Sequence, residues 1–231
     1  MAPPTSPAPR RESALSRQRI IDAAIELLDD KGEVGLTFRA LATRLSTGPG
    51  AIYWHVTNKG ELLTAAAASA LAPALTARDQ DTPQDTVRRA ALGVFDSVRA
   101  HPWIGGQLAG PASQRPAMLT ILERLGQQVS RLGVPPDERF AIASALLNYI
   151  LGVAAHEAAN QRHVGVDADR AAILAAESLA WQRLDPATYP FLHEVSDRMS
   201  THDDREQFLT GIDLILAGIT SPTPWNEPDA P

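Results

Sequence analysis

Apolar residues recur every three or four positions over most of the chain, the spacing that gathers them on one face of an α-helix. Beyond residue 80 this period predicts helices separated by Pro, Gly or polar segments, over 84–100, 103–108, 116–132, 137–162, 170–184, 191–199 and 203–219. No segment alternates apolar and polar residues as a half-buried strand does. We therefore predict an all-α fold.

The stretch 37–61 (TFRALATRLSTGPGAIYWHVTNKGE) has a more specific pattern. Thr37 is a suitable N-cap for a helix with one apolar stripe. The following STG interrupts the period, and Pro49 suits the first position of a second helix of about two turns. Asn58 and Glu61 then form a capping-box-like start for a third helix. The order is helix, tight turn, helix, cap.

The second of these helices is short and carries an aromatic cluster. Ile52 and Val56 are four residues apart and can hold it down, which leaves Tyr53, Trp54 and His55 largely outward. Such a helix would make a poor core element, but it suits a recognition helix in the major groove of DNA. The alternative is a helical hairpin whose aromatic residues pack on a neighbouring domain.

A further helix precedes this stretch. Ser16 can cap it, its apolar residues line one face, and Gly32 is expected to stop it. The Pro-rich residues 1–12 lack periodicity and indicate a disordered arm that closes with two arginines. The arm either contacts phosphates or the minor groove, or is a solvated tail.

Residues 15–71 resemble the DNA-binding domain of the tetracycline-repressor (TetR) family of bacterial regulators. The matching segments are LSRQRIIDAAIELLDDKG, LTFRALATRL and AIYWHVTNKGELL. A looser likeness continues around 101–103 and 151–152. The resemblance implies a three-helix helix-turn-helix domain and a larger helical domain for ligand binding and dimerisation. It also implies a ligand-responsive regulator, by family habit a repressor, released from a palindromic double-stranded DNA operator.

The pattern and the resemblance together divide the chain. We expect a disordered arm at 1–12, a helix-turn-helix domain at 13–60 and a connecting helix at 61–78 that Pro73 kinks or ends. A helical ligand-binding and dimerisation domain follows at 79–220, and a Pro-rich tail occupies 221–231.

The resemblance also assigns the DNA contacts. Pro49, Gly50 and Ala51 occupy positions that face bases, and Ala51 can contact a thymine methyl. Arg39 is the candidate for a bidentate guanine contact. The expected contacts to the DNA backbone are Thr37, Tyr53, Trp54, His55 and Lys59, Trp54 combining contact with packing. The alternative for Tyr53 and Trp54 is packing against the first helix.

Charge supports this division. The whole chain has a net charge of −6, but residues 1–60 carry 8 Arg/Lys against 6 Asp/Glu, and residues 61–231 carry 13 against 21. The basic excess thus lies where phosphate is expected. Cysteine is absent, which excludes disulfides and thiolate sites. The N-terminal stretch lacks the charged-then-apolar layout of a signal peptide. The longest apolar runs fall short of the ~20 residues of a bilayer span. We therefore expect a cytoplasmic protein without a membrane partner.

Catalytic and metal-binding patterns are missing. There is no HExxH, no GxSxG and no phosphate-cradling glycine loop. Founding TetR members hold magnesium-chelated tetracycline with a histidine just before a Leu-Gly pair, but the corresponding segment 106–110 has none. We expect no cofactor, no metal and no enzyme. The alternative function is a helical protein-interaction scaffold without a ligand. An enzyme is the least favoured alternative.

The most apolar helix, 137–162, carries polar residues that need partners. Leaving a buried polar group unpaired costs about 1–3 kcal/mol, so the core, a second subunit or a ligand must satisfy Asn148 and His156. We predict that they line a pocket for a small apolar or aromatic effector. The other predicted lining residues are Phe95, Trp103, Gln107, Met118, Leu122 and Tyr149.

Helices 137–162 and 203–219 carry more apolar surface than one core face can bury. Two copies of each would form the four-helix packing that the family uses, so we predict a homodimer. The predicted interface residues are Leu147, Leu151, Phe208, Ile212, Ile215, Leu216 and Ile219.

Overall fold

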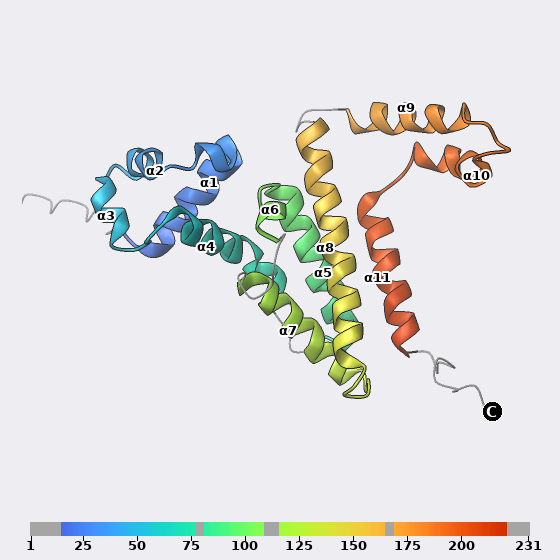
Figure 1. The fold of residues 1–231 in the computed structure, drawn as a ribbon, viewed down its shortest axis with the longest axis horizontal. Helices are drawn as coiled ribbons and strands as arrows, with labels where there is room; N and C mark the ends of the chain where they lie inside the picture. Colours follow the sequence, from blue (N-terminus) through green and yellow to red (C-terminus); the bar gives the residue numbers. More distant parts are fainter. Residues whose placement is uncertain (1–14, 77–80, 109–115, 165–168, 221–231) are drawn as a thin grey trace, which may run out of the picture. The chain divides into compact units, whose positions relative to one another are not determined.

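The computed structural model describes residues 15–76, 81–108, 116–164 and 169–220, and these residues contain helices and no strand. The helices are α1 (Arg17–Gly35), α2 (Phe38–Arg44), α3 (Pro49–Tyr53), α4 (Lys59–Leu71), the 3-10 helix η1 (Ala72–Leu75), α5 (Pro83–Ala100), α6 (Ile104–Leu108), α7 (Pro116–Arg131), α8 (Arg139–Val164), α9 (Arg170–Gln182), α10 (Pro190–Met199) and α11 (Asp204–Thr220). The all-α fold is confirmed (Figure 1).

The chain divides into two compact units, Met1–Ser69 and Ala70–Pro231. The boundary falls within α4, so the segment predicted as a connecting helix is shared between the units. The predicted arm at 1–12 and the predicted tail at 221–231 lie outside the described residues.

The caps of the first unit form where the sequence predicts them. The side-chain oxygens of Ser16 and Thr37 accept the backbone N–H three residues on, at 3.2 and 3.1 Å. Pro49 is the first residue of α3. Gly32 does break the helical conformation, with φ 63°, but the chain resumes the helix to Gly35, so the predicted stop is a kink.

The recognition helix is shorter than predicted. α3 has five residues, little more than one turn, and Trp54 is its C-cap. Ile52 and Val56 are buried, with 0% and 1% of their surface exposed, as their spacing predicts. The segment after α3 is therefore held by side-chain burial rather than by further helical turns.

Helix α4 ends at Leu71, two residues before Pro73, as the proline predicts. Pro73 lies in η1, which packs against α5. A Cβ on Gly93 of α5 would lie 2.3 Å from the Cβ of Ala74, so only glycine allows η1 to approach this closely. The turn after α4 is thereby held against α5 within the second unit.

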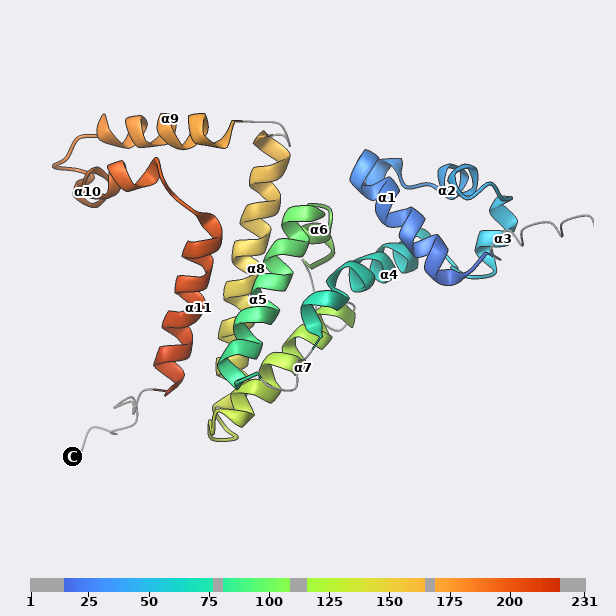
Figure 2. The ribbon, with the colours of Figure 1, turned by 180° about the vertical axis from the view of Figure 1, so that it is seen from behind.

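In the second unit, α5 and α8 form the centre. α7 and α11 each pack against both of them, and α6 packs against α8 (Figures 1 and 2). α9 and α10 pack on each other as a helical hairpin. The core residues include Val94, Ile104, Ile121, Leu125, Leu146 and Ile150, each with 0% of its surface exposed.

Three aromatic rings join the central helices. The ring of Phe208 on α11 stacks on Phe95 of α5, at 5.2 Å between centroids, and on Tyr149 of α8, at 5.6 Å. The Tyr149 hydroxyl donates to the backbone oxygen of Phe208 at 3.3 Å. Burial raises the pKa of Tyr149 above its ordinary value. The stack is part of the core of a single chain.

This packing corrects four of the predicted interface residues. Leu147, Phe208, Ile212 and Leu216 are buried within one chain, against its own α5, α8 and α11, so they are core residues. Leu151, Ile215 and Ile219 remain partly exposed. The most exposed large apolar residues of these two helices are instead Phe140, 75% exposed, and Leu214, 69% exposed. The four buried residues turn inward because their positions on α8 and α11 face the neighbouring helices of the same chain.

The length of α8 also corrects an expectation. Residues Arg139–Gln161 form one helix that is long and apolar enough to cross a membrane by length and composition, and 33% of its most apolar window is buried within the chain. The core helix of a globular protein passes the same test. Within the chain, α8 packs against α5, α6, α7 and α11.

Candidate nucleic-acid interface

The outer face of α3 is open to solvent. Pro49 and Gly50 are exposed and Ala51 is partly exposed, which suits their predicted role at base edges. Trp54 is 90% exposed and Tyr53 56% exposed, so the prediction that both point outward is confirmed. Covering the exposed Trp54 side chain with a partner would remove apolar surface from water, which favours binding.

Tyr53 has a neighbour in the preceding helix. Its ring stacks on Phe38 of α2, with 4.4 Å between centroids and 6° between ring planes. The alternative considered for Tyr53 is packing against the first helix, but its ring partner lies on α2. The stack holds α3 against α2 and still leaves more than half of Tyr53 accessible.

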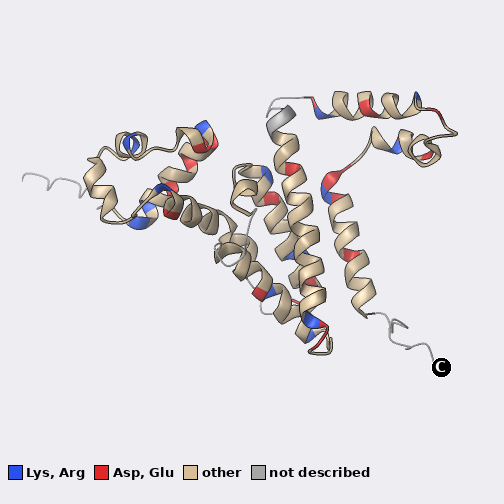
Figure 3. Cartoon of the chain, in the orientation of Figure 1, with Lys and Arg blue, Asp and Glu red and all other residues tan. Residues whose placement is uncertain are grey.

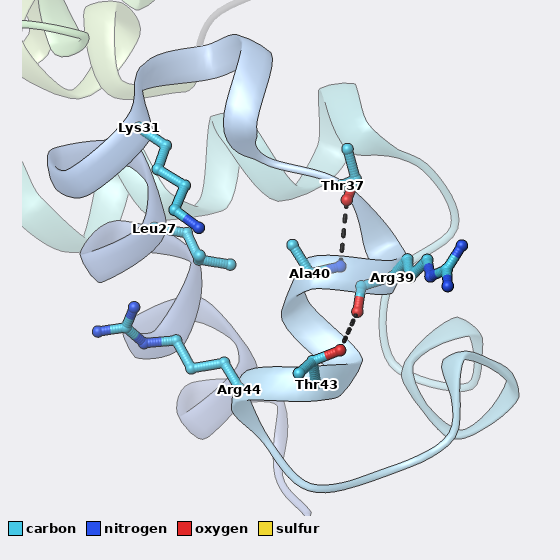
Figure 4. A pocket seen from close by; sticks show the side chains of 7 residues that line it. All are labelled: Leu27, Lys31, Thr37, Arg39, Ala40, Thr43 and Arg44. Carbon is cyan, nitrogen blue, oxygen red and sulfur yellow. Dashed lines mark hydrogen bonds between the residues drawn. The ribbon is translucent and has the colours of Figure 1, made fainter.

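The two arginines of α2 differ in their surroundings. Arg44 donates to Glu26 at 2.7 Å and to Asp30 at 2.9 Å, hydrogen bonds that raise its pKa. The guanidinium of Arg39 has no hydrogen bond or ion pair within the part of the chain that the structure describes. Figure 4 shows it directed away from Arg44. Arg39 is therefore available to an external acceptor without breaking an ion pair, whereas Arg44 already binds two carboxylates.

An open hollow of about 430 Å³ lies beside α2, lined by Leu27, Lys31, Thr37, Arg39, Ala40, Thr43 and Arg44 (Figure 4). Its hydroxyls serve the helix itself. Thr37 caps it, and the Thr43 hydroxyl donates to the backbone oxygen of Arg39 at 3.0 Å. The hollow is thus part of the helix-turn-helix surface, and we assign it no ligand.

His55 and Lys59 follow α3 in the chain, and both are partly exposed. The Lys59 ammonium donates to the backbone oxygen of Glu33, which ties the start of α4 to the end of α1. A lysine has three donors, so one intramolecular bond leaves two for a phosphate.

The acidic residues of the described part of the first unit lie outside α2 and α3 (Figure 3). Residues 38–53, which hold α2 and α3, contain Arg39 and Arg44 and no Asp or Glu. The carboxylates lie on α1 and at the start of α4 instead. A phosphate backbone approaching α2 and α3 therefore meets no carboxylate on these two helices.

The predicted effector residues do not form one group. Trp103, Met118 and Phe95 are buried, whereas Gln107 and Leu122 are partly buried. Phe95 and Tyr149 belong to the aromatic stack described above, and a Cβ on Gly211 would lie 2.0 Å from the Tyr149 hydroxyl. These two residues fill the core instead of facing an open space.

Asn148 and His156 also differ from the prediction. Both are exposed on α8 in the single chain, and His156 pairs with Asn160 at 3.3 Å. The argument that each is a buried polar group needing a ligand is therefore wrong. The apolar run of α8 concealed this, because small alanines on its outer side have the same apolar character as core residues.

One carboxylate among the described residues is buried although its sequence context did not suggest it. Glu157 on α8 is 6% exposed, accepts from Gln161 at 3.0 Å and lies 3.9 Å from Arg99 of α5. The helical period could have found it, since Glu157 follows the buried Ile150 by seven residues. The described residues contain no group of three His, Asp or Glu that could hold a metal ion.

Comparisons with known proteins cover both units. Residues 20–66 match the family described as bacterial regulatory proteins, tetR family, and residues 75–222 match the tetracyclin repressor-like C-terminal domain. The tetracycline repressor protein class D of Escherichia coli is 29% identical over 214 residues, which is 88% of each chain.

Solved structures agree. The transcriptional regulator SCO7222, a TetR from Streptomyces coelicolor, is 53% identical with a TM-score of 0.82, covering 90% of this chain and 98% of that one. ActR of the same organism, in complex with actinorhodin, shares the fold at 21% identity and a TM-score of 0.71, covering 90% and 96%. The chain belongs to the tetracycline-repressor family of DNA-binding, ligand-responsive transcriptional regulators.

Proposed function

We propose that the chain is a cytoplasmic repressor that binds a palindromic operator as a homodimer and leaves it when a small apolar or aromatic molecule binds. The observation that carries the DNA-binding part is an exposed Arg39, without a side-chain partner among the described residues, beside a short, exposed recognition helix. One such helix reads too few base pairs for useful specificity, and two-fold symmetric proteins place two of them about one DNA turn apart.

The exposed side of α8 and α11 supports the homodimer. Small residues follow one another along α8 at Ala141, Ala145, Gly152 and Ala155, and Leu214 lies exposed on α11. Small side chains allow two helices to approach closely, and the large apolar residues at the rim would be removed from water. A second copy that covers this side accounts for the limited burial of α8 without a membrane.

The second unit supports the effector. ActR is described in complex with actinorhodin, and a TetR variant of Acinetobacter baumannii in complex with minocycline, at 24% identity. For this chain we retain Trp103, Gln107, Met118 and Leu122 as the lining residues. We withdraw the stacked Phe95 and Tyr149 from that set. We also withdraw Asn148 and His156, which are exposed. Family members act as regulators and not generally as enzymes, and we assign no catalytic step.

The proposal is tested by selecting duplexes from random DNA with the purified full-length chain and footprinting the winners. We expect an inverted repeat protected over two half-sites whose centres lie about 10 base pairs, or a multiple of that, apart. Sedimentation of the complex should give two chains per duplex. An asymmetric footprint bound by one chain would contradict the homodimer and leave DNA binding intact.

A further inference from the structure

The carboxylate of Glu61 lies at the corner between the recognition helix and α4. One of its oxygens accepts the backbone N–H of Thr57 at 2.8 Å, and the other accepts from the guanidinium of Arg17 at 3.1 Å. The backbone N–H of Glu61 itself donates to the Asn58 side chain at 2.9 Å. Glu61 is partly exposed, so these bonds form at the surface of the unit.

These partners belong to three different elements. Thr57 directly follows Val56, whose backbone N–H closes the end of the recognition helix on Ile52 at 3.1 Å. Arg17 is the first residue of α1, and Glu61 lies in the first turn of α4. A single carboxylate thus joins the exit of α3, the start of α4 and the start of α1.

The arrangement differs from an ordinary capping box. There the acidic side chain would return to the N–H of the cap residue, Asn58. Here it reaches Thr57, one residue earlier, and so holds the corner as well as its own helix. The N–H of Thr57 and then the guanidinium of Arg17 lower the pKa of Glu61, so the carboxylate is charged at neutral pH.

We infer that Glu61 is a positioning residue for operator recognition, which sets the direction of α3 relative to α4 while Arg17 anchors the carboxylate to α1. The inference rests on the DNA-binding function proposed above. α3 has only five residues, and its own attachments are Ile52, Val56 and the stack of Tyr53 on Phe38. Its direction therefore depends on the corner that follows it.

A positioning role and a simple charge effect predict opposite changes in operator affinity when Glu61 is replaced. Removing a negative charge near DNA should strengthen binding to every duplex, because the phosphates meet less repulsion. Misdirecting α3 should instead weaken binding to the operator, because hydrogen bonds to base edges require accurate geometry and phosphate contacts tolerate more. Exposed ion pairs contribute little to global stability, so the unit should stay folded.

The test compares full-length Glu61→Ala and Glu61→Gln with wild type, using fluorescence anisotropy on the duplex selected by wild type and on a scrambled duplex. We expect operator affinity to fall about tenfold in Glu61→Ala, roughly the loss of one good base contact. Affinity for the scrambled duplex should stay equal or rise. Glu61→Gln, which keeps an acceptor for Thr57, should lie between the two.

Two further variants serve as controls. Glu26→Gln removes the same charge from another exposed ion pair, with Arg44, and should leave the ratio of operator to scrambled affinity unchanged. Arg17→Met should lower that ratio, and Arg17→Lys should restore it in part. A thermal-melting curve checks the fold of each variant.

Operator binding of Glu61→Ala equal to wild type would overturn the inference. An equal loss on both duplexes with a lowered melting temperature would also overturn it, since it would mark a purely stabilising residue. A wild-type chain that selects no duplex would overturn the proposed function together with this inference, whereas wild-type selection with an indifferent Glu61→Ala overturns this inference alone.

Discussion

Arg39 and Arg44 lie on the same short helix but differ in what they already bind. Arg44 is already bound by two carboxylates of α1, and its release would leave them unpaired. Arg39 carries its charge to the surface without such a cost. The difference is set by the register of α1 against α2, because positions 26 and 30 of α1 face Arg44 only.

Replacing Arg39 by Ala should weaken operator binding by about 1–3 kcal/mol and relax the preference at one base pair in each half-site, because a bidentate guanine contact is lost. Replacing Lys59 by Ala should weaken binding to all sequences and flatten the salt dependence, because a phosphate contact is lost. Binding assays on the operator and its single-base variants, across salt concentrations, check both. Equal weakening of operator and unrelated DNA by Arg39→Ala would contradict the base contact.

At the scale of the element, α11 has two sides with different tasks. Phe208, Ile212 and Leu216 pack into the chain's own core, with 0–2% of their surface exposed. Leu214 lies on the opposite side. A charge at Leu216 would therefore oppose folding itself and not only separate two subunits, because a buried charge without a partner is costly.

We expect Leu214→Glu to give folded monomers, because it places charges within the proposed interface of two copies. Sedimentation should show half the wild-type mass, with the helical circular-dichroism signal retained. Leu216→Glu serves as the contrast and should lower the melting temperature strongly or prevent folding. If Leu214→Glu remained a dimer of wild-type stability, the interface would lie elsewhere.

At the scale of the whole molecule, α4 is the segment that runs from the DNA-binding unit into the second unit. Its end continues into η1, which the close approach at Gly93 seats on α5. An effector can release the operator only by binding the DNA-free state more tightly, and a 100-fold release requires about 2.7 kcal/mol of differential affinity.

A compound found by thermal shift against the purified chain should therefore bind less tightly when the operator is present. Trp103→Ala should weaken the compound without changing operator affinity, because Trp103 is buried in the second unit. Asn148→Ala is the matched control and should leave the compound's affinity unchanged, since Asn148 is exposed. Calorimetry with and without operator measures both. A compound indifferent to DNA would contradict the switch, and unchanged binding in Trp103→Ala would contradict the pocket.

Local sequence patterns were enough to predict that the chain is helical, where its first caps lie and where the recognition helix begins. Ser16, Thr37 and Pro49 act within one turn of their own position, so a local pattern is enough to find them. The exposed Tyr53 and Trp54 follow in the same way from the period of a short helix.

Which side of each long helix faces the core depends on how the helices pack against one another. α8 is apolar nearly all round, so its sequence period could not distinguish the buried Leu147 from the exposed Asn148 beside it. The stack of Phe208 on Phe95 and Tyr149 and the bond from Arg17 to Glu61 join residues 44 or more positions apart. Such partners are chosen by how whole helices pack, because shape and volume at the contact are properties of two segments together.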